Sequence, residues 1–193
     1  MLPIRRRDKS NLGRWNRWYW KHTLRSYLPF LVKETPIYGD RTTYHLAADF
    51  LSDVSVVEDW GCGLGGFRKF CKTKYIGLDG SWAPHCDRTV DLVHYRSNAD
   101  GILLRHVLEH NYEWRAIVQN AVESFRRKMC VVLFTPFSAV TREIHWWPEL
   151  GVPDISFNRE ELVSYFAGLH VRSQEGLATR SQYKVEHVFF LEK

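Results

Sequence analysis

The chain lacks any apolar run of the roughly 18 or more residues that a membrane-spanning helix needs. The arginines Arg5–Arg7 near the N-terminus are not followed by an apolar segment, which argues against a secretory signal. Its four cysteines show no CxxC spacing, so free thiols in a reducing compartment are expected in place of a disulfide framework. Together these absences predict a cytoplasmic protein without a transmembrane segment.

Internal repeats and low-complexity segments are also missing, so 193 residues predict one domain with a substantial core. Hydrophobic residues make up 45% and charged residues 25%, which is ordinary for a globular protein. The net charge of +5 is unevenly distributed, because residues 1–27 carry +7 and the rest of the chain −2. We therefore expect a basic, aromatic arm or helix over residues 1–40 and a separate body over residues 41–193.

The arm has a pattern of its own. Basic residues recur at helical spacing in Arg14, Arg17, Lys21 and Arg25, and aromatic residues such as Trp15 fall on another face. This spacing predicts an amphipathic helix with a positive side. Three roles are open: packing over the body with the basic side solvated, binding a phosphorylated substrate or a single-stranded nucleic acid, or contact with a membrane surface.

Apolar periodicity predicts the elements of the body. Strands are expected at residues 54–60, 74–79, 89–93, 101–105, 129–135, 169–174 and 185–192, and helices at 40–51, 65–72, 112–128 and from 158 to 168. Alternation of strands and helices implies right-handed crossovers and a mostly parallel sheet. The last two strands are joined by a polar connection and should pair antiparallel. The sequence predicts an α/β fold: a Rossmann-like, seven-stranded, mostly parallel sheet with an antiparallel last strand and helices on both faces.

One segment, Ser138–Ser156, carries little secondary-structure signal and contains the aromatic stretch His145–Pro148. It is expected to form an aromatic lid that excludes water from a site, or else a packed surface loop.

A glycine-rich turn follows the first strand of the body. Gly61-x-Gly63-x-x-Gly66 satisfies the dinucleotide fingerprint. However, Asp59 at the strand end would repel a pyrophosphate and favour a cationic ligand. The sequence has no Tyr-x-x-x-Lys pair, and its length leaves no room for a separate substrate domain. These features argue against a nicotinamide dinucleotide.

The same turn resembles the first motif of the class I S-adenosylmethionine-dependent methyltransferases, D-x-G-x-G-x-G, at Asp59–Gly65. Ile76–Asp79 is similar to their second strand with its acidic end. Val107–His110 (V-L-E-H) resembles the segment after strand four in the ubiquinone/menaquinone-biosynthesis-like methyltransferase group. The resemblance covers roughly residues 54–136, with a compatible closing strand at 185–192. It implies an S-adenosyl-L-methionine-binding methyltransferase domain over residues 41–193.

The resemblance also implies a cofactor site. Asp59 would help to hold the amino group, and Asp79 would accept both ribose hydroxyls with its two oxygens. Asp91-Leu92 is the nearest match to the acidic residue beside the adenine, although Asp87 competes with it. A turn role for Asp79 and a capping role for Asp91 or Asp87 are open alternatives. The implied cofactor-binding residues are Asp59, Gly61, Cys62, Gly63, Gly65, Asp79, Gly80, Asp91, Leu92 and Arg105.

Methyl transfer requires the protein to align an acceptor and to take a proton. Because ligands in open α/β sheets lie beyond the carboxyl ends of strands, the candidate catalytic residues are His106, Arg105 and His110. His106 is the preferred base, since imidazole titrates near neutrality, unless it only shapes the loop. Arg105 would grip a carboxylate or phosphate, or pair with a neighbouring acid. Glu109 is expected to cap or orient the following helix, and no metal is expected.

The segment after the fifth strand, Thr135–Ser138, is unlike the N-P-P-Y or D-P-P-Y motif of amino-directed DNA methyltransferases. The Pro-Cys context of cytosine-C5 enzymes is also missing from the cysteines outside the glycine turn. We therefore expect a methyltransferase that acts on oxygen of a small-molecule, sugar-like or glycan acceptor. The alternative is a nucleic-acid-binding protein of the same fold, either an RNA methyltransferase or a catalytically inactive relative, that binds through the basic arm.

Overall fold

The computed structural model describes residues 38–39, 41–81, 85–148 and 150–193. The predicted arm over residues 1–40, with its basic stripe, lies outside these residues except for Tyr38 and Gly39. The division of the chain into an arm and a body therefore stays a prediction. None of the helices in the described ranges is long and apolar enough to cross a bilayer.

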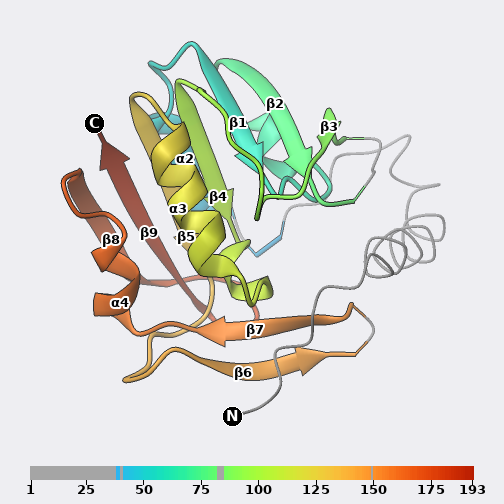
Figure 1. Cartoon of the computed structure of the whole chain (residues 1–193), viewed down its shortest axis with the longest axis vertical. Helices are drawn as coiled ribbons and strands as arrows, with labels where there is room; N and C mark the ends of the chain where they lie inside the picture. Colours follow the sequence, from blue (N-terminus) through green and yellow to red (C-terminus); the bar gives the residue numbers. More distant parts are fainter. Residues whose placement is uncertain (1–37, 40, 82–84, 149) are drawn as a thin grey trace.

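Seven strands form one sheet in the order β3-β2-β1-β4-β5-β9-β8 (Figure 1). β1 pairs parallel with β2 and β4, and the β2–β3 and β4–β5 pairs are parallel as well. β9 lies between β5 and the edge strand β8 and is antiparallel to both, which confirms the predicted sheet. The strands are β1 Val56–Trp60, β2 Lys74–Asp79, β3 Arg88–Thr89, β4 Gly101–Arg105, β5 Lys128–Leu133, β8 His170–Ala178 and β9 Val185–Glu192.

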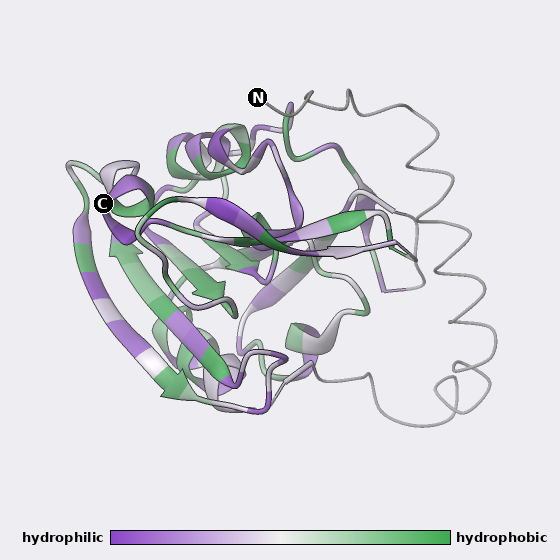
Figure 2. Ribbon diagram, turned by 90° about the horizontal axis from the view of Figure 1, so that it is seen from below, coloured by the Kyte–Doolittle hydropathy of each residue, from purple (hydrophilic) through white to green (hydrophobic). Residues whose placement is uncertain are grey.

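Helices cover both faces of the sheet, as predicted. α2 (Thr42–Phe50) packs on one face, and α3 (Trp114–Ser124) and α4 (Arg159–Ser164) pack on the other, where Figure 1 shows α3 in front of the strands. The central strand β4 serves both cores, because Leu103 points to α2 while Ile102 and Leu104 point to α3. The edge strand β8 is mostly exposed and mostly hydrophilic in Figure 2.

The helix predicted at residues 65–72 is almost absent. Only a single 3-10 turn, η1 (Gly66–Lys69), follows the glycines, with Phe67 buried beneath it. β2 starts at Lys74, so the chain has only a few residues in which to return to the opposite end of the sheet. A helix advances 1.5 Å per residue and an extended chain more than 3 Å, so a helix of this length could not cover the distance.

Residues 138–156, where the sequence carries little secondary-structure signal, contain regular structure. They contain a hairpin of β6 (Arg142–Trp147) and β7 (Val152–Ser156). In Figure 1 it lies across the end of the sheet at which β1, β2 and β4 finish, and in Figure 2 it crosses in front of the strands. The two strands were not predicted because β6 is mostly exposed and bulged, and β7 contains Pro153 and Asp154, residue types that disfavour strands.

The core position of Trp114 gives a first prediction. Its indole is 1% exposed and packs edge-on against Phe157 and Tyr165, with ring centroids 5.0 and 5.5 Å away. We expect Trp114→Ala to lower the free energy of unfolding by about 3–5 kcal/mol, because it leaves a large cavity. Trp146→Ala is the matched control: Trp146 is 37% exposed and should cost about 1 kcal/mol. Equal losses in urea denaturation of the two variants would contradict this account of the core.

Candidate functional site

The strands β1, β2 and β4 end side by side. Trp60 at the end of β1 lies opposite Leu78 of β2 and Leu104 of β4. From β1 the chain continues to β2 and β3 on one side of the sheet. It then returns to β4 on the other side of β1, so the direction of strand order reverses between β1 and β4. Such a reversal leaves a crevice beyond the carboxyl ends of the strands, where open α/β sheets bind ligands. The structure therefore brings the predicted site segments, which begin at Gly61, Gly80 and His106, to one edge.

The glycine turn is pressed against its neighbours. Gly61 and Cys62 both donate backbone hydrogen bonds to the carbonyl of Leu78, at 2.7 and 2.9 Å. Gly61 has a φ of +77°, and a Cβ there would lie 2.5 Å from a methyl group of Val107. Gly65 has a similar role, because a Cβ there would lie 2.8 Å from the Cβ of His85. These two glycines are explained by contacts within the protein.

Gly63 and Gly80 differ from them. The nearest atom to a Cβ at Gly63 would be 4.0 Å away, in the ring of Tyr38, and at Gly80 it would be 3.9 Å away. Within the described residues, a Cβ at either position would therefore meet only ordinary van der Waals contacts. Gly63 has a φ of +52°, a left-handed conformation that glycine adopts without strain. The backbone at Gly63 and Gly80 is the part of this edge that a ligand could approach closely.

Two carboxylates flank this space. Asp79 uses Oδ2 to accept from the Gly63 N–H at 2.9 Å and Oδ1 to accept from the N–H and hydroxyl of Ser81, both at 2.9 Å. Asp79 therefore has the turn role that was an open alternative, and Oδ2 keeps a further lone pair. Asp59 is 3% exposed and accepts from the Tyr75 hydroxyl at 2.8 Å. Burial raises the pKa of Asp59 to about 7.

Other predicted cofactor residues lie at the same edge in different environments. The thiol of Cys62 is buried and shares a hydrogen bond with that of Cys86, so Cys62 faces the protein. Leu92 belongs to the hydrophobic core, whereas the exposed Asp91 accepts from the backbone N–H of Val93 at 3.0 Å. Their role toward a cofactor stays a prediction.

Asp87, the competitor of Asp91, has structural partners. It accepts from the backbone N–H of Gly77 at 2.7 Å and from Arg68 at 2.6 Å. These contacts hold the connection between β2 and β3 in place.

Arg105 is part of a buried ionic cluster. Its guanidinium donates to Glu186 at 2.9 Å, to the Tyr38 carbonyl at 2.8 Å and to the Thr43 hydroxyl at 3.3 Å, and it lies 3.9 Å above the Tyr44 ring. Its side chain is 6% exposed and that of Glu186 is fully buried. Of the two alternatives raised by the sequence, the structure shows the ion pair with a neighbouring acid.

His106 belongs to the same cluster and has a φ of +56°, which is unusual for a residue other than glycine. Its Nε2 lies 2.6 Å from Glu186, and its Nδ1 lies 3.4 Å from a guanidinium nitrogen of Arg105. Since the carboxylate can only accept and the guanidinium can only donate, Nε2 carries the hydrogen. Burial, with the nearby Arg105 charge, lowers the pKa of His106 well below its ordinary value. Both ring nitrogens of the preferred base are thus engaged by the protein.

Glu109 does not bond to the helix that follows it. It is fully buried, and its Oε1 accepts from the backbone N–H of Phe134, just after β5, at 2.6 Å. Its Oε2 has no hydrogen-bond partner among the described residues. Burial raises the pKa of Glu109 to about 7. The residue ties the loop after β4 to the end of β5, which differs from the capping role expected from the sequence.

His110 has the opposite environment to His106. Its Nδ1 lies 2.9 Å from the carbonyl of Pro153 and 3.2 Å from the carboxylate of Asp154, and its side chain is 26% exposed. Burial lowers its pKa, but the adjacent Asp154 carboxylate and the hydrogen bond to the Pro153 carbonyl outweigh burial, so the net pKa is raised. Asp154 was missed in the sequence, because it lies in the hairpin that was predicted to be a loop. Only the unusual placement of an acid between apolar residues of β7 signalled it.

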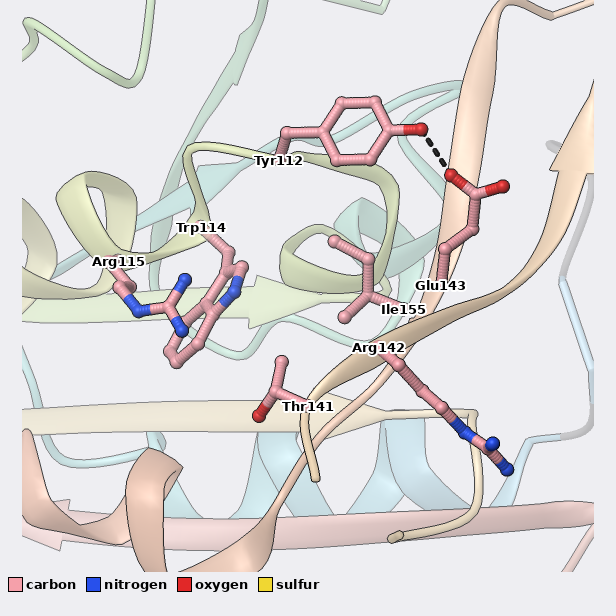
Figure 3. A pocket seen from close by; sticks show the side chains of 7 residues that line it. All are labelled: Tyr112, Trp114, Arg115, Thr141, Arg142, Glu143 and Ile155. Atoms are coloured by element: carbon pink, nitrogen blue, oxygen red, sulfur yellow. Dashed lines mark hydrogen bonds between the residues drawn. The ribbon is translucent and has the colours of Figure 1, made fainter. Parts of the chain in front are cut away.

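The hairpin is fastened to the loop after β4. Tyr112 donates a hydrogen bond to Glu143 and stacks on Trp146, with ring centroids 6.3 Å apart. A cavity of about 150 Å³ lies between the start of α3 and the hairpin (Figure 3). Its lining residues are Tyr112, Trp114, Arg115, Thr141, Arg142, Glu143 and Ile155, none of which belongs to the glycine turn. The cavity is smaller than a typical ligand pocket.

No protein-family model matches the sequence, and no curated protein matches it. Solved structures match its fold. The Burkholderia thailandensis 1,6-didemethyltoxoflavin-N1-methyltransferase, solved with 1,6-didemethyltoxoflavin and S-adenosylhomocysteine, aligns with a TM-score of 0.68 at 14% identity, over 95% of this chain and 88% of its own. An S-adenosylmethionine-dependent methyltransferase from Archaeoglobus fulgidus aligns with a TM-score of 0.58 at 13% identity, over 92% and 99%. The fold is that of the class I methyltransferases.

The methyltransferase fold does not by itself settle the reaction. The [4+2]-cyclase SpnF has it as well, with a TM-score of 0.65 at 12% identity, over 92% of this chain and 95% of its own. The chemistry must therefore be argued from the residues of the site.

The residues at this edge fit a cofactor with an ammonium, a sulfonium and a ribose diol. Asp59 and Asp79 place two acids at the strand ends beside the glycine turn, and among the described residues no atom would lie closer than 3.9 Å to a Cβ at Gly63 or Gly80. In the part of the chain that the structure describes, no cation forms an ion pair with the buried Asp59, which suits it to a positively charged group. S-adenosylmethionine satisfies these requirements, with Asp59, Gly63, Asp79 and Gly80 as the residues that would hold it.

The ionic cluster gives a second prediction. We expect Glu186→Ala to lower the free energy of unfolding by about 3–5 kcal/mol, because it leaves the buried Arg105 charge unpaired. The matched control is Glu192→Ala on the same strand. Its ion pair with Arg172 is 3.2 Å long and exposed, so the cost should be about 1 kcal/mol or less. Guanidinium denaturation measures both, and a Glu186 variant as stable as the Glu192 variant would contradict the account.

The raised pKa of Glu109 gives a third prediction. When the pKa of an acid is higher in the folded than in the unfolded state, the folded state binds the proton more tightly. The stability that this provides is complete below the unfolded pKa and is lost as the pH rises to the folded pKa. Glu109 should therefore destabilise the fold progressively between pH 4.5 and pH 7. We expect Glu109→Gln to remove this loss, with a difference in slope of up to about 1.4 kcal/mol per pH unit.

The measurement is the free energy of unfolding of both proteins from pH 4 to pH 8. Asp59 contributes the same sign in this window and His106 the opposite sign, so only the difference between the two curves reports Glu109. Parallel curves would show that Glu109 is ionised in the folded protein.

Proposed function

We propose that the protein is an S-adenosylmethionine-dependent methyltransferase that methylates an oxygen of a small-molecule or sugar-like acceptor. The observation that carries the proposal is a glycine turn with an acid at each of the two strand ends beside it. Asp79 accepts from the backbone N–H of the middle glycine, Gly63, and the buried Asp59 lies near the end of the strand that leads into the turn. The V-L-E-H segment at Val107–His110 favours the ubiquinone/menaquinone-biosynthesis-like group within the fold.

When bound, S-adenosylmethionine supplies an electrophilic methyl group on a sulfonium. Asp59 would bind the ammonium, and its carboxylate would ionise because a cation beside it lowers its pKa. Asp79 would accept from the ribose diol while it holds Gly63 and Ser81 in place. Gly61, Cys62 and Gly65 would shape the turn, and Gly80, Asp91 and Leu92 would border the adenosine.

The three predicted catalytic residues receive different roles. Arg105 and His106 act as positioning residues, because their polar atoms are engaged within the buried cluster. His110 is the favoured proton acceptor, since its Nε2 has no hydrogen-bond partner among the described residues and its side chain is partly exposed. Arg105, which was also predicted to bind the cofactor, would act on it indirectly, by holding His106 and the loop after β4 in position.

Proteins of similar fold support the proposal that the methyl acceptor is a small molecule. The Burkholderia thailandensis protein was solved with 1,6-didemethyltoxoflavin, and a mitomycin 7-O-methyltransferase and human N-acetylserotonin methyltransferase align with TM-scores of 0.50 and 0.53. The hairpin over the edge of the sheet also favours a small acceptor, because its aromatic side chains would exclude water around it.

A second candidate rests on the sequence alone. The charge of +7 in residues 1–27 favours binding of a nucleic acid by the arm, with an RNA methyltransferase or an inactive binding protein as the result. The free thiols expected from the sequence favour a cytoplasmic location for either function.

The cofactor assignment gives a fourth prediction. We expect Asp79→Ala to weaken binding of S-adenosylhomocysteine at least tenfold, because it removes charge-assisted hydrogen bonds worth roughly 1.5–3 kcal/mol. Asp49→Ala is the control, since this acid is exposed and its ion pair among the described residues is with Lys72. Isothermal titration calorimetry measures both affinities. An unchanged affinity in a folded Asp79 variant would remove Asp79 from the cofactor site.

The same titration separates the two functions. Wild-type protein should bind S-adenosylhomocysteine, and a single-stranded oligonucleotide should bind weakly or not at all. Tight, salt-dependent binding of the oligonucleotide without cofactor binding would favour the second candidate. A screen with labelled cofactor against nucleotide sugars, glycans, phenols and RNA would then identify the acceptor.

A further inference from the structure

Asp154 on β7 is a buried carboxylate with an uneven set of partners. Its Oδ2 accepts from the Trp147 indole at 3.0 Å, from the Tyr183 hydroxyl at 2.8 Å and from the Gln182 amide at 3.3 Å. These donors come from β6 and from the connection between β8 and β9, so they fix the carboxylate from two separate segments. Three donors on Oδ2 leave Oδ1 for a different partner.

Oδ1 of Asp154 is buried and receives no directed hydrogen bond from the described residues. Its nearest cationic candidate is His110, whose Nδ1 lies 3.2 Å away. A buried carboxylate oxygen without a donor is costly, and a positive charge on the neighbouring ring reduces that cost. The geometry therefore stabilises the protonated form of His110.

The partners of His110 also determine which nitrogen is free. The Pro153 carbonyl, at 2.9 Å, and the Asp154 carboxylate can only accept, so Nδ1 carries the hydrogen of the neutral ring. Nε2 then carries a lone pair. Among the described residues no group bonds to Nε2, and the side chain is 26% exposed. The ring rests against Phe134, with centroids 5.3 Å apart, at the carboxyl edge of the sheet.

We propose that Asp154 is the positioning residue of a His110–Asp154 dyad in which Nε2 of His110 takes the proton of the acceptor hydroxyl. This inference rests on the proposed methyl transfer. The acceptor oxygen forms its bond to the methyl carbon, the carbon–sulfur bond breaks with its electron pair left on sulfur, and the hydroxyl proton passes to Nε2. The positive charge lost from sulfur appears on the imidazolium, beside Asp154.

The surroundings of the two histidines explain why the dyad is built on His110. His106 lies between the Arg105 guanidinium and the Glu186 carboxylate, and burial together with the Arg105 charge lowers its pKa. His110 lies beside Asp154 of β7 and Glu109 of its own turn, with His106 as a nearby basic group. The neighbours of His110 raise its pKa while the environment of His106 lowers it, which favours His110 as the residue that takes the proton.

The fifth prediction tests the dyad without the acceptor. The histidine rings of the full chain, saturated with S-adenosylhomocysteine, are observed by ¹⁵N NMR over a pH titration. Wild-type His110 should show the Nδ1–H form when neutral and a pKa above the ordinary histidine value. Asp154→Asn should lower the pKa of His110 by about one unit or more, because it removes the adjacent negative charge.

Two further variants keep the test decisive. Asp53→Asn is the control, because this half-exposed acid pairs with Lys128 and Arg127 and should leave His110 unchanged. Tyr183→Phe removes one donor from Oδ2 and should raise the pKa of His110, since the carboxylate becomes more basic. It also covers the case in which Asp154→Asn does not fold. A neutral His110 with the hydrogen on Nε2, or an unshifted pKa in both dyad variants, would overturn the proposal.

Turnover then separates the dyad from the proposed function. With an acceptor identified by the labelled-cofactor screen, Asp154→Asn should lower kcat about tenfold or more at pH 7, with KM and cofactor affinity nearly unchanged. An unchanged kcat would overturn the role of Asp154. Wild-type protein that binds no S-adenosylhomocysteine would refute the proposed methyltransferase, whatever the titration of His110 in the free protein shows.

Discussion

The buried ion pair between Arg105 and Glu186 joins the parts of the structure that make the site. Glu186 comes from the last strand, Arg105 from the end of β4, and Thr43 of α2 donates to the same carboxylate at 3.0 Å. Burying two charges is costly unless every partner is in place, so these three elements must meet in one arrangement. In that arrangement Glu186 of β9 also lies 2.6 Å from Nε2 of His106, a residue with a positive φ. The arrangement also explains why Arg105 has no donor left for a substrate carboxylate.

The two histidines after β4 differ in their partners and in the direction of their pKa shifts. His106 is enclosed by Arg105 and Glu186 and stays neutral, while His110, one helical turn further along, lies against Asp154 and gains basicity. Both rings lie against Phe134, with centroids 4.8 and 5.3 Å away. Two residues of the same type and four positions apart thus acquire opposite pKa shifts from the burial, hydrogen bonds and charges that tertiary packing gives each of them.

The β6–β7 hairpin packs against the loop that follows β4, at the carboxyl edge of the sheet. Tyr112 and Trp146 stack where the loop after β4 meets β6, and Asp154 reaches inward from β7 to His110. The aromatic stretch singled out in the sequence and the acid–histidine contact are therefore parts of one hairpin. Because Asp154 lies on this hairpin, the position of the hairpin determines the distance between His110 and its neighbouring carboxylate.

The sequence by itself determined the sheet. The continuous apolar runs at β4 and β5 and the strand–glycine–acid order of β1 and β2 are local signals, so their positions and the α/β class could be predicted. The glycine turn and its two acids were predicted for the same reason, since a motif is contiguous in the chain. The tertiary structure decided the rest. η1 is short because of the distance that the chain must cover before Lys74, and the β6–β7 hairpin lacks a periodic pattern because most of β6 is exposed. The partners of Arg105, His106 and His110 are Glu186 and Asp154, which lie 44 to 81 positions away along the chain. No local pattern encodes such a contact, because burial and charge at a residue are set by whichever distant segments pack against it.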